Sequence, residues 1–252
     1  MLSTYSKFIY GFEVIATNKY FSIGDGVTDY EVELDEGSYT PNELLTEIKE
    51  KVLAQATLTI DGSISYQNQT YTFTSASNFD LNITSGNSSS VFTLLGFTGA
   101  DVTGVTTATS NETFGSVFKP QVLLQGYVPF EHNKNLLFPS VNKTVSGDTQ
   151  LIYFGDESYM TCDVRYQTDI RQPSGSLIED QANGLQNLLS FLNYAIKKNK
   201  IVFYPDRDGS TVYTCLLDSI AGNKNATGYR LREYLGKMNG YYTTGQLIFR
   251  RI

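Results

Sequence analysis

The residues best suited to catalysis are few in this 252-residue chain and lie far apart. Its one histidine, His132, stands in the segment PFEHNKN, and no serine or cysteine in a recognisable turn accompanies it. A Ser-His-Asp or Cys-His mechanism needs a nucleophile within hydrogen-bond reach of its base. Paired carboxylates for glycoside hydrolysis need only meet in space, but no pair is singled out. We interpret His132 as an ordinary loop residue and predict that the chain is not an enzyme and has no catalytic residues.

Metal and cofactor sites are equally poorly supported by the sequence. One histidine and two distant cysteines, Cys162 and Cys215, do not make a zinc ligand set. The segment DRDGS at 206–210 resembles the start of a calcium loop but lacks the later acidic ligand, and GDGVTD at 24–29 is also interpreted as a tight turn. No phosphate-binding loop or dinucleotide fingerprint is present. We predict no metal and no cofactor; the cysteines are expected to be buried thiols, with a disulfide left open.

Composition and charge restrict the partners. The formal net charge is −7, and the densest basic group is only Lys197, Lys198 and Lys200, so specific nucleic-acid binding is not expected. No stretch approaches the roughly 18 apolar residues of a membrane helix, and the first 15 residues lack the pattern of a signal peptide. Hydrophobic residues make up 40% of the chain, which is enough to bury a core.

Two segments have the periodicity of helices. Residues 41–55 follow Thr40, an N-cap residue that forms a capping box with Glu43. Their apolar face consists of Leu44, Leu45, Ile48 and Val52. Residues 177–198 follow Ser176, which would form a second capping box with Glu179. Their apolar face consists of Leu185, Leu188, Leu189, Leu192, Ala195 and Ile196. Each helix is expected to pack on a sheet.

Most other segments predict strands, because Tyr, Thr and Val alternate with polar residues along them. Tyr30, Val32 and Leu34 alternate in this way, and Asp61-Gly62 predicts a hairpin turn between two short strands. The Thr-, Ser- and Gly-rich segment GVTTATSNETFGS, from 104 to 116, has no periodicity and predicts a domain boundary between about 104 and 125. The expected fold is mainly β (α+β), with two β-rich domains, 1–110 and 111–252. Each would be an antiparallel sheet or sandwich with one flanking helix.

The segment SSSVFTLLGFTG, residues 88–99, is an apolar cluster inside a polar region. Ser88–Ser90 can cap a short helix whose bulky residues are Val91, Phe92, Leu94 and Leu95. Gly96 permits a left-handed C-terminal stop, after which Phe97 can fold back on the helix. This segment is therefore expected to form a plug that seals one open end of a small sheet layer.

Residues 20–105 resemble a pattern found in virion structural proteins of tailed bacteriophages and some large DNA viruses. In that pattern an extended strand leads through a G-x-Y-[ST] turn into a helix, and a hairpin is followed by a short helix that ends LLGF. The matching residues are Gly37, Tyr39, Thr40, Leu44, Ile48, Asn78, Phe79, Leu94, Leu95, Gly96 and Phe97. This resemblance implies a virion context rather than a position in the particle.

The second half is more loosely similar, in its order of elements, to distal-tail and tail-tube proteins. The resemblance implies a homo-oligomeric ring of the tail or baseplate, assembled in the host cytoplasm, with a lumen that passes DNA without specific binding and no membrane contact. Residues 20–105 would then be a contact domain and residues 125–252 the ring-forming part. A neck or capsid-associated position, or a receptor or glycan-binding module built on exposed tyrosines, remains an alternative.

Overall fold

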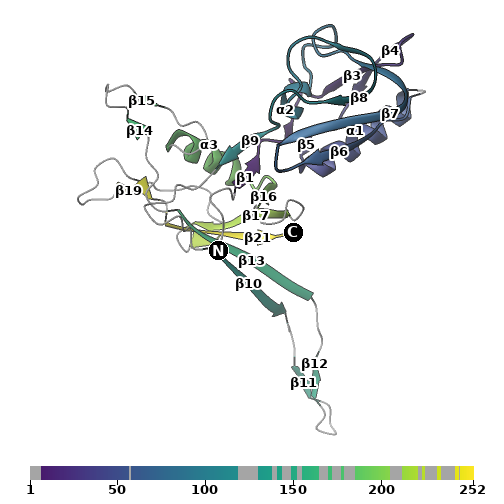
Figure 1. Ribbon diagram of the computed structural model, residues 1–252. Helices are drawn as coiled ribbons and strands as arrows, with labels where there is room; N and C mark the ends of the chain where they lie inside the picture. Colours follow the sequence, from purple (N-terminus) through teal and green to yellow (C-terminus); the bar gives the residue numbers. More distant parts are fainter. Residues whose placement is uncertain are drawn as a thin grey trace. The chain divides into compact units, whose positions relative to one another are not determined.

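The computed structural model describes residues 7–118 apart from Thr57, 185–204, 212–220 and 245–252, and the backbone of further short strands between 130 and 243 (Figure 1). As predicted, the chain is mainly β, with antiparallel sheets and few helices. It divides into two compact units. The N-terminal unit consists of Lys7–Phe118 and Asn199–Val212, and the C-terminal unit of Met1–Ser6, Lys119–Lys198 and Tyr213–Ile252.

This division differs from the expected boundary after residue 110. Residues 111–118 stay with the N-terminal unit, and strand β16 (Ile201–Tyr204) returns to it from far along the chain. In that unit β1 (Lys7–Tyr10) pairs antiparallel with β16 on one side and with β9 (Ser116–Phe118) on the other. Local sequence patterns cannot reveal this arrangement, because backbone pairing joins residues almost two hundred positions apart.

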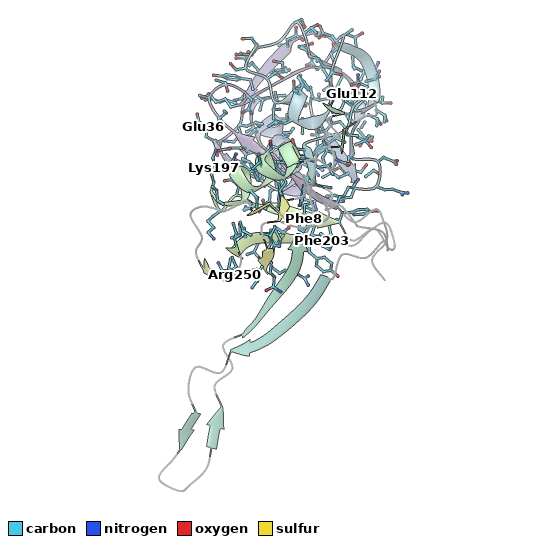
Figure 2. All side chains as sticks on the ribbon, turned by 90° about the vertical axis from the view of Figure 1, so that its left-hand side faces the viewer. Phe8, Glu36, Glu112, Lys197, Phe203 and Arg250 are labelled. Carbon is cyan, nitrogen blue, oxygen red and sulfur yellow. The ribbon has the colours of Figure 1, made fainter. Side chains whose placement is uncertain are left out.

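An aromatic row crosses these three strands. The register aligns Phe8 with both Phe118 and Phe203, and all three side chains are buried. The ring centroids of Phe8 and Phe203 are 5.0 Å apart, and those of Phe8 and Phe118 are 6.2 Å apart. Figure 2 shows Phe8 and Phe203 close together. Such cross-strand aromatic pairs stabilise a sheet beyond their buried area, so the returning strand is joined by side chains as well as by its backbone.

The main sheet of the N-terminal unit has five antiparallel strands. They are β3 (Tyr20–Gly24), β4 (Asp29–Glu33), β6 (Asp61–Ser65), β7 (Thr70–Leu81) and β8 (Val102–Thr109). The order is β4-β3-β7-β6, and β8 also pairs with β7. The first part of β7 lies between β6 and β8, and its last residues pair with β3 and β8. A small ladder joins β2 (Glu13–Val14) to β5 (Gly37–Ser38).

The hairpin predicted at Asp61-Gly62 is wrong: both residues lie inside β6, and the chain turns between Ser65 and Thr70. The glycine has a packing reason instead. A Cβ at Gly62 would lie 2.8 Å from Leu45 Cδ1 and 3.0 Å from the Thr72 carbonyl oxygen. Glycine is therefore needed here for the close approach of a helix to the strand and not for a turn.

Helix α1 (Pro41–Gln55) has the bounds and the capping box predicted from the sequence. Thr40 Oγ1 accepts a hydrogen bond from Glu43 N at 3.2 Å, and Glu43 Oε2 accepts one from Thr40 N at 2.8 Å. The four apolar residues of the predicted face are buried in the core together with Phe21, Phe73 and Phe79. Figure 1 shows α1 alongside the strands of this sheet.

The segment that returns to the N-terminal unit, residues 199–204, also contacts the start of α1. Lys200 Nζ forms an ion pair with Glu43 Oε1 at 2.7 Å, and Lys200 N donates a hydrogen bond to Ser38 Oγ at 3.1 Å. Partial burial works against ionisation of Glu43, but the hydrogen bonds from Lys200 and Thr40 outweigh it, so the pKa of this carboxyl is lowered. Glu43 therefore takes part both in the helix cap and in the ion pair with the returning segment.

The LLGF segment folds as predicted. Helix α2 (Phe92–Leu95) ends at Gly96, whose φ is 79°, and Ser90 Oγ accepts a hydrogen bond from Phe92 N at 3.2 Å. Gly96 N donates to Thr93 O at 3.2 Å, and Phe97 N donates to Phe92 O at 2.9 Å. This is the Schellman pattern, and its usual apolar contact is present, because the rings of Phe92 and Phe97 are 6.1 Å apart.

The C-terminal unit has a sheet in the order β10-β13-β21-β17, with β18 paired to β17. Its strands are β10 (Phe130–Leu137), β13 (Gly155–Val164), β17 (Tyr213–Ile220), β18 (Asn223–Lys224) and β21 (Gly245–Arg251). Three short ladders join β11 (Val141–Lys143) to β12 (Thr149–Leu151), β14 (Ile170–Arg171) to β15 (Leu177–Ile178), and β19 (Arg232–Glu233) to β20 (Tyr242–Thr243). Helix α3 (Leu185–Ala195) contacts the sheet, and the rings of Phe191 and Phe249 are 6.2 Å apart.

Two expectations about this unit are wrong. The helix predicted over 177–198 is described over Leu185–Ala195, whereas Leu177–Ile178 form a strand, so Ser176 does not cap a helix that begins at Leu177. Residues 179–184 lie outside the described residues. His132, interpreted as a loop residue, lies in β10 opposite Met160.

Candidate interaction surface

The residues considered for chemistry are not brought together by the described part of the chain. No group of three or more His, Cys, Asp or Glu side chains able to hold a metal ion occurs among the described residues. Cys215 is a buried thiol, and burial raises its pKa. The side chains of His132 and Cys162 and the segment 206–210 lie outside the described residues.

The acidic segment at 24–29 is a hairpin turn, as predicted. Gly24 and Asp29 are paired, Asp25 N donates to Thr28 O at 3.1 Å, and Gly26 has a φ of 83°. Asp25 Oδ1 accepts hydrogen bonds from the backbone N–H groups of Val27 and Thr28. The carboxylate is therefore used by the turn itself.

The described tyrosines do not form the exposed cluster that a glycan-binding module would need. Five are buried: Tyr10, Tyr66, Tyr71, Tyr194 and Tyr204. Four are partly buried: Tyr20, Tyr30, Tyr39 and Tyr213. Burial raises the pKa of Tyr10 and of Tyr66 to about 12. These described side chains fill sheet faces and cores.

The main sheet of the N-terminal unit has three edge strands, β4, β6 and β8. Strand β4 has the sequence DYEVE, and its three carboxylates are exposed. Glu33 forms an ion pair with Lys19, and Glu31 Oε1 accepts a hydrogen bond from Asn87 Nδ2 at 3.1 Å. Strand β6 begins at Asp61, which forms an ion pair with Lys49 at 2.6 Å. Charged side chains on an edge discourage further strand pairing.

Strand β8 differs from both, because its sequence VTGVTTAT has no charged residue and no proline. Five of its residues are exposed to solvent: Thr103, Gly104, Thr106, Thr107 and Thr109. Among the described strands β8 pairs only with β7. Its regular part is Thr107–Thr109, which pairs with Thr72–Thr74, and the register shifts between Thr107 and Val105. The sequence pattern does not predict this strand, because an edge exposed on both faces shows no apolar alternation.

Side-chain hydrogen bonds fix both ends of β8. Just before it, Asp101 Oδ1 accepts hydrogen bonds from Thr84 N at 2.6 Å, Thr84 Oγ1 at 3.0 Å and Ser85 N at 3.3 Å. Just after it, Ser110 Oγ accepts a hydrogen bond from Tyr71 N at 3.1 Å and donates one to Glu112 O at 3.2 Å. The edge is therefore a preorganised strand and not a loose loop.

The Asp101 contacts give a test by pH. Hydrogen bonds from the Ser85 side chain and the Thr84 backbone lower the pKa of Asp101 to about 2. A folded-state pKa below the unfolded value adds stability above about pH 4, and this stability is lost as the pH falls toward 2. We expect Asp101→Asn to lower the free energy of unfolding at pH 6 by about 1 kcal/mol, because a charged acceptor becomes neutral. Urea denaturation at pH 6 and pH 2.5 measures this, and a difference from wild type that is equal at both values would contradict it.

The C-terminal unit contains a second distinctive edge, called here the hairpin ribbon: β10 with β13, and β11 with β12. Strand β10 pairs with β13 from Phe130 opposite Cys162 to Leu137 opposite Gly155 (Figure 1). Strand β21 pairs only with the part of β13 from Tyr159 to Val164. Among the described strands, none supplies a third strand beside residues 155–158, and β11–β12 is a ladder of two strands.

No protein-family model matches this chain, and no curated protein is significantly similar to it. Within the part of the chain that is described, no helix is long and apolar enough to cross a membrane. The candidate surfaces among the described strands are the uncharged edge β8 and the hairpin ribbon.

Proposed function

We propose that this protein is a structural component of a bacteriophage virion that acts by assembly, as a homo-oligomeric ring of the tail, distal tail or baseplate. The observation that carries the assembly function is the hairpin ribbon. The virion context is supported by the G-x-Y-[ST] and LLGF residues, whose helix and Schellman turn belong to one buried core.

The ribbon favours assembly for an energetic reason. A two-stranded hairpin by itself is marginally stable in water, because its faces and both outer edges stay hydrated. The pairing from Lys134 to Leu137 with residues 155–158 continues past the last residue that β21 pairs with. A neighbouring subunit that adds a strand or covers a face would stabilise this extension. Such a contact would join different surfaces of two subunits, which makes it heterologous. Repeated contacts of this kind would close a ring if the rotation between neighbouring subunits is cyclic.

A neck or capsid-associated position is compatible with the same residues and is the alternative within the virion. Mass spectrometry of purified particles, followed by labelling of the chain for electron microscopy, separates these positions. Label at the tail supports the proposal. Label in the capsid shell would contradict the tail position, and absence from particles would contradict the virion context.

The ribbon itself can be removed cleanly. Asn133 and Tyr159 are paired, so replacing residues 134–158 with Asn-Gly should close a tight hairpin there and delete the extension past β21 together with β11 and β12. We expect the full-length wild-type chain to sediment as a multimer and this variant to sediment with at most a few chains. Analytical ultracentrifugation over a hundredfold range of concentration measures both.

A matched control keeps the ribbon. Lys143 and Thr149 are also paired, so replacing residues 144–148 with Asn-Gly inserts the same turn but retains β11 and β12. This control is expected to keep the wild-type mass. A wild-type chain that is monomeric at every concentration, or a ribbon deletion with unchanged mass, would contradict the proposal.

A further inference from the structure

We propose that the returning segment, residues 199–204, is exchanged between copies of this chain, so that β16 of one copy completes the N-terminal unit of its neighbour. The inference rests on the proposed assembly function and names the segment that joins successive subunits. It is separate from the hairpin ribbon, which belongs to the C-terminal unit, because the site that takes β16 lies within the N-terminal unit.

The N-terminal unit holds β16 in a site of defined chemistry. All four residues of the strand are buried, and Val202 and Tyr204 belong to the same hydrophobic core as α1 and β7. Strand β1 supplies its backbone partners, and Lys7 Nζ lies 5.3 Å from the centroid of the Tyr204 ring. The site therefore takes an extended, uncharged strand whose side chains enter a core, which is how strand addition gains both affinity and specificity.

The contacts of the returning segment do not depend on the residues that connect it to its own chain. Ser38 and Glu43, which bind Lys200, precede that residue by 162 and 157 positions. The same segment of a second copy would form identical contacts, which is the basis of exchange between identical subunits. The ion pair of Lys200 with Glu43 makes this contact attractive locally, although a net charge of −7 opposes association in general.

The connection that leads into the segment is less favourable than the contacts of the segment. Helix α3 ends at Ala195, β16 begins at Ile201, and the chain passes from the C-terminal to the N-terminal unit between Lys198 and Asn199. Lys198 has a φ of 63°, in the left-handed region that favours glycine. Asn199 Nδ2 is buried, and no described group forms a hydrogen bond with it. Backbone strain and an unsatisfied donor thus fall on adjacent residues at the crossing.

These costs belong to the connection and not to the strand, so they favour exchange. A short connection under strain can extend when the segment that follows it enters another copy, whereas the contacts of β16 stay the same. Within one chain, the segment binds without the entropic cost of association. A neighbour held in a ring reduces that cost, because its binding site is present at a high effective concentration. Relief at Lys198 and Asn199 then favours the exchanged form.

The main test is a pair of cysteines across β1 and β16 in the full-length chain. Ile9 and Val202 are partners in this ladder, and antiparallel partners have Cα atoms about 4.5 to 5.5 Å apart, within the range that a disulfide spans. After mild oxidation, we expect most of the Ile9→Cys, Val202→Cys variant to run on a non-reducing denaturing gel as covalent dimers and larger species. The two single-cysteine variants are the controls and should run as single chains. A gel with no species larger than one chain would overturn the exchange.

A longer connection gives a second measurement that leaves every buried side chain in place. Insertion of Gly-Gly between Lys198 and Asn199 removes the strain and lets the segment close on its own chain. We expect the protein concentration at which half of the assembly dissociates, measured by analytical ultracentrifugation, to rise about tenfold or more. The control inserts Gly-Gly between Gly26 and Val27, which are exposed in the turn at 24–29, and should leave that concentration unchanged. An unchanged value for the first insertion would contradict the exchange.

The exchange and the proposed ring fail separately. If the cysteine pair joins different chains and the ribbon deletion lowers the mass, both are supported. If the ribbon deletion lowers the mass but the disulfide forms within one chain, the ring is supported and the exchange is overturned. If wild type is only a dimer and its cysteine pair joins the two chains, the exchange stands and the ring is contradicted.

Discussion

Replacing Gly96 with alanine is expected to lower the free energy of unfolding of the N-terminal unit by about 3 to 5 kcal/mol. Gly96 has a φ of 79°, where a side chain is strained, and it is buried. A Cβ would also overlap the carbonyl oxygen of Glu112 and lie 3.1 Å from Thr113 C. Because the neighbouring atoms are backbone, they cannot move without breaking the hydrogen bond from Glu112 N to Gly96 O at 2.9 Å.

Gly99 provides a matched control for this variant. Its φ is 90°, but a Cβ there would meet nothing within 4 Å. Gly99→Ala should therefore lose only the conformational part, about 1 kcal/mol. Urea denaturation of both variants measures the difference, and a melting temperature about 10 °C lower is expected for Gly96→Ala. Equal losses in the two variants would show that the close approach to Glu112 contributes nothing.

Replacing Phe73 with alanine should destabilise the N-terminal unit by about 3 to 5 kcal/mol. Phe73 is fully buried on β7, and its ring centroid lies 5.4 Å from that of Phe21 and 5.5 Å from that of Phe97. It therefore connects the sheet to the plug formed by α2. The alanine variant would leave a cavity between the sheet and the plug that the surrounding backbone cannot fill.

Phe73→Leu is the conservative comparison. It keeps most of the buried volume and loses the ring contacts, so a smaller loss of about 1 to 2 kcal/mol is expected. Chemical denaturation of both variants, followed by far-ultraviolet circular dichroism, gives the two values. A loss below 1 kcal/mol for Phe73→Ala would contradict the described packing between the sheet and the plug.

Features that depend on neighbouring residues could be predicted from the sequence. The capping box of Thr40 and Glu43, the four-residue apolar face of α1 and the left-handed stop at Gly96 all form between residues at most a few positions apart. The turn at 24–29 is local in the same way. Each is decided by backbone conformation and short-range hydrogen bonds, which the residue types largely fix.

Features that depend on exposure or on contacts with distant residues could not be predicted from the sequence. The strand at Val102–Thr109 shows no apolar alternation, because as an edge strand it is exposed on both faces over most of its length. Gly62 resembles a turn residue, yet its role is to admit Leu45. The periodicity of 177–198 concealed a strand at Leu177–Ile178, because side-chain pattern alone does not report where backbone hydrogen bonds begin.

The sequence by itself thus determined the strand-rich class, the position of α1 and the LLGF turn. Only the tertiary structure decided that Ile201–Tyr204 pairs with β1 in the N-terminal unit, that β8 is the uncharged edge, and that β13 extends beyond β21. The physical reason is that local conformation is set by adjacent residues, whereas strand partners are chosen by backbone hydrogen bonds and packing between residues far apart in the chain.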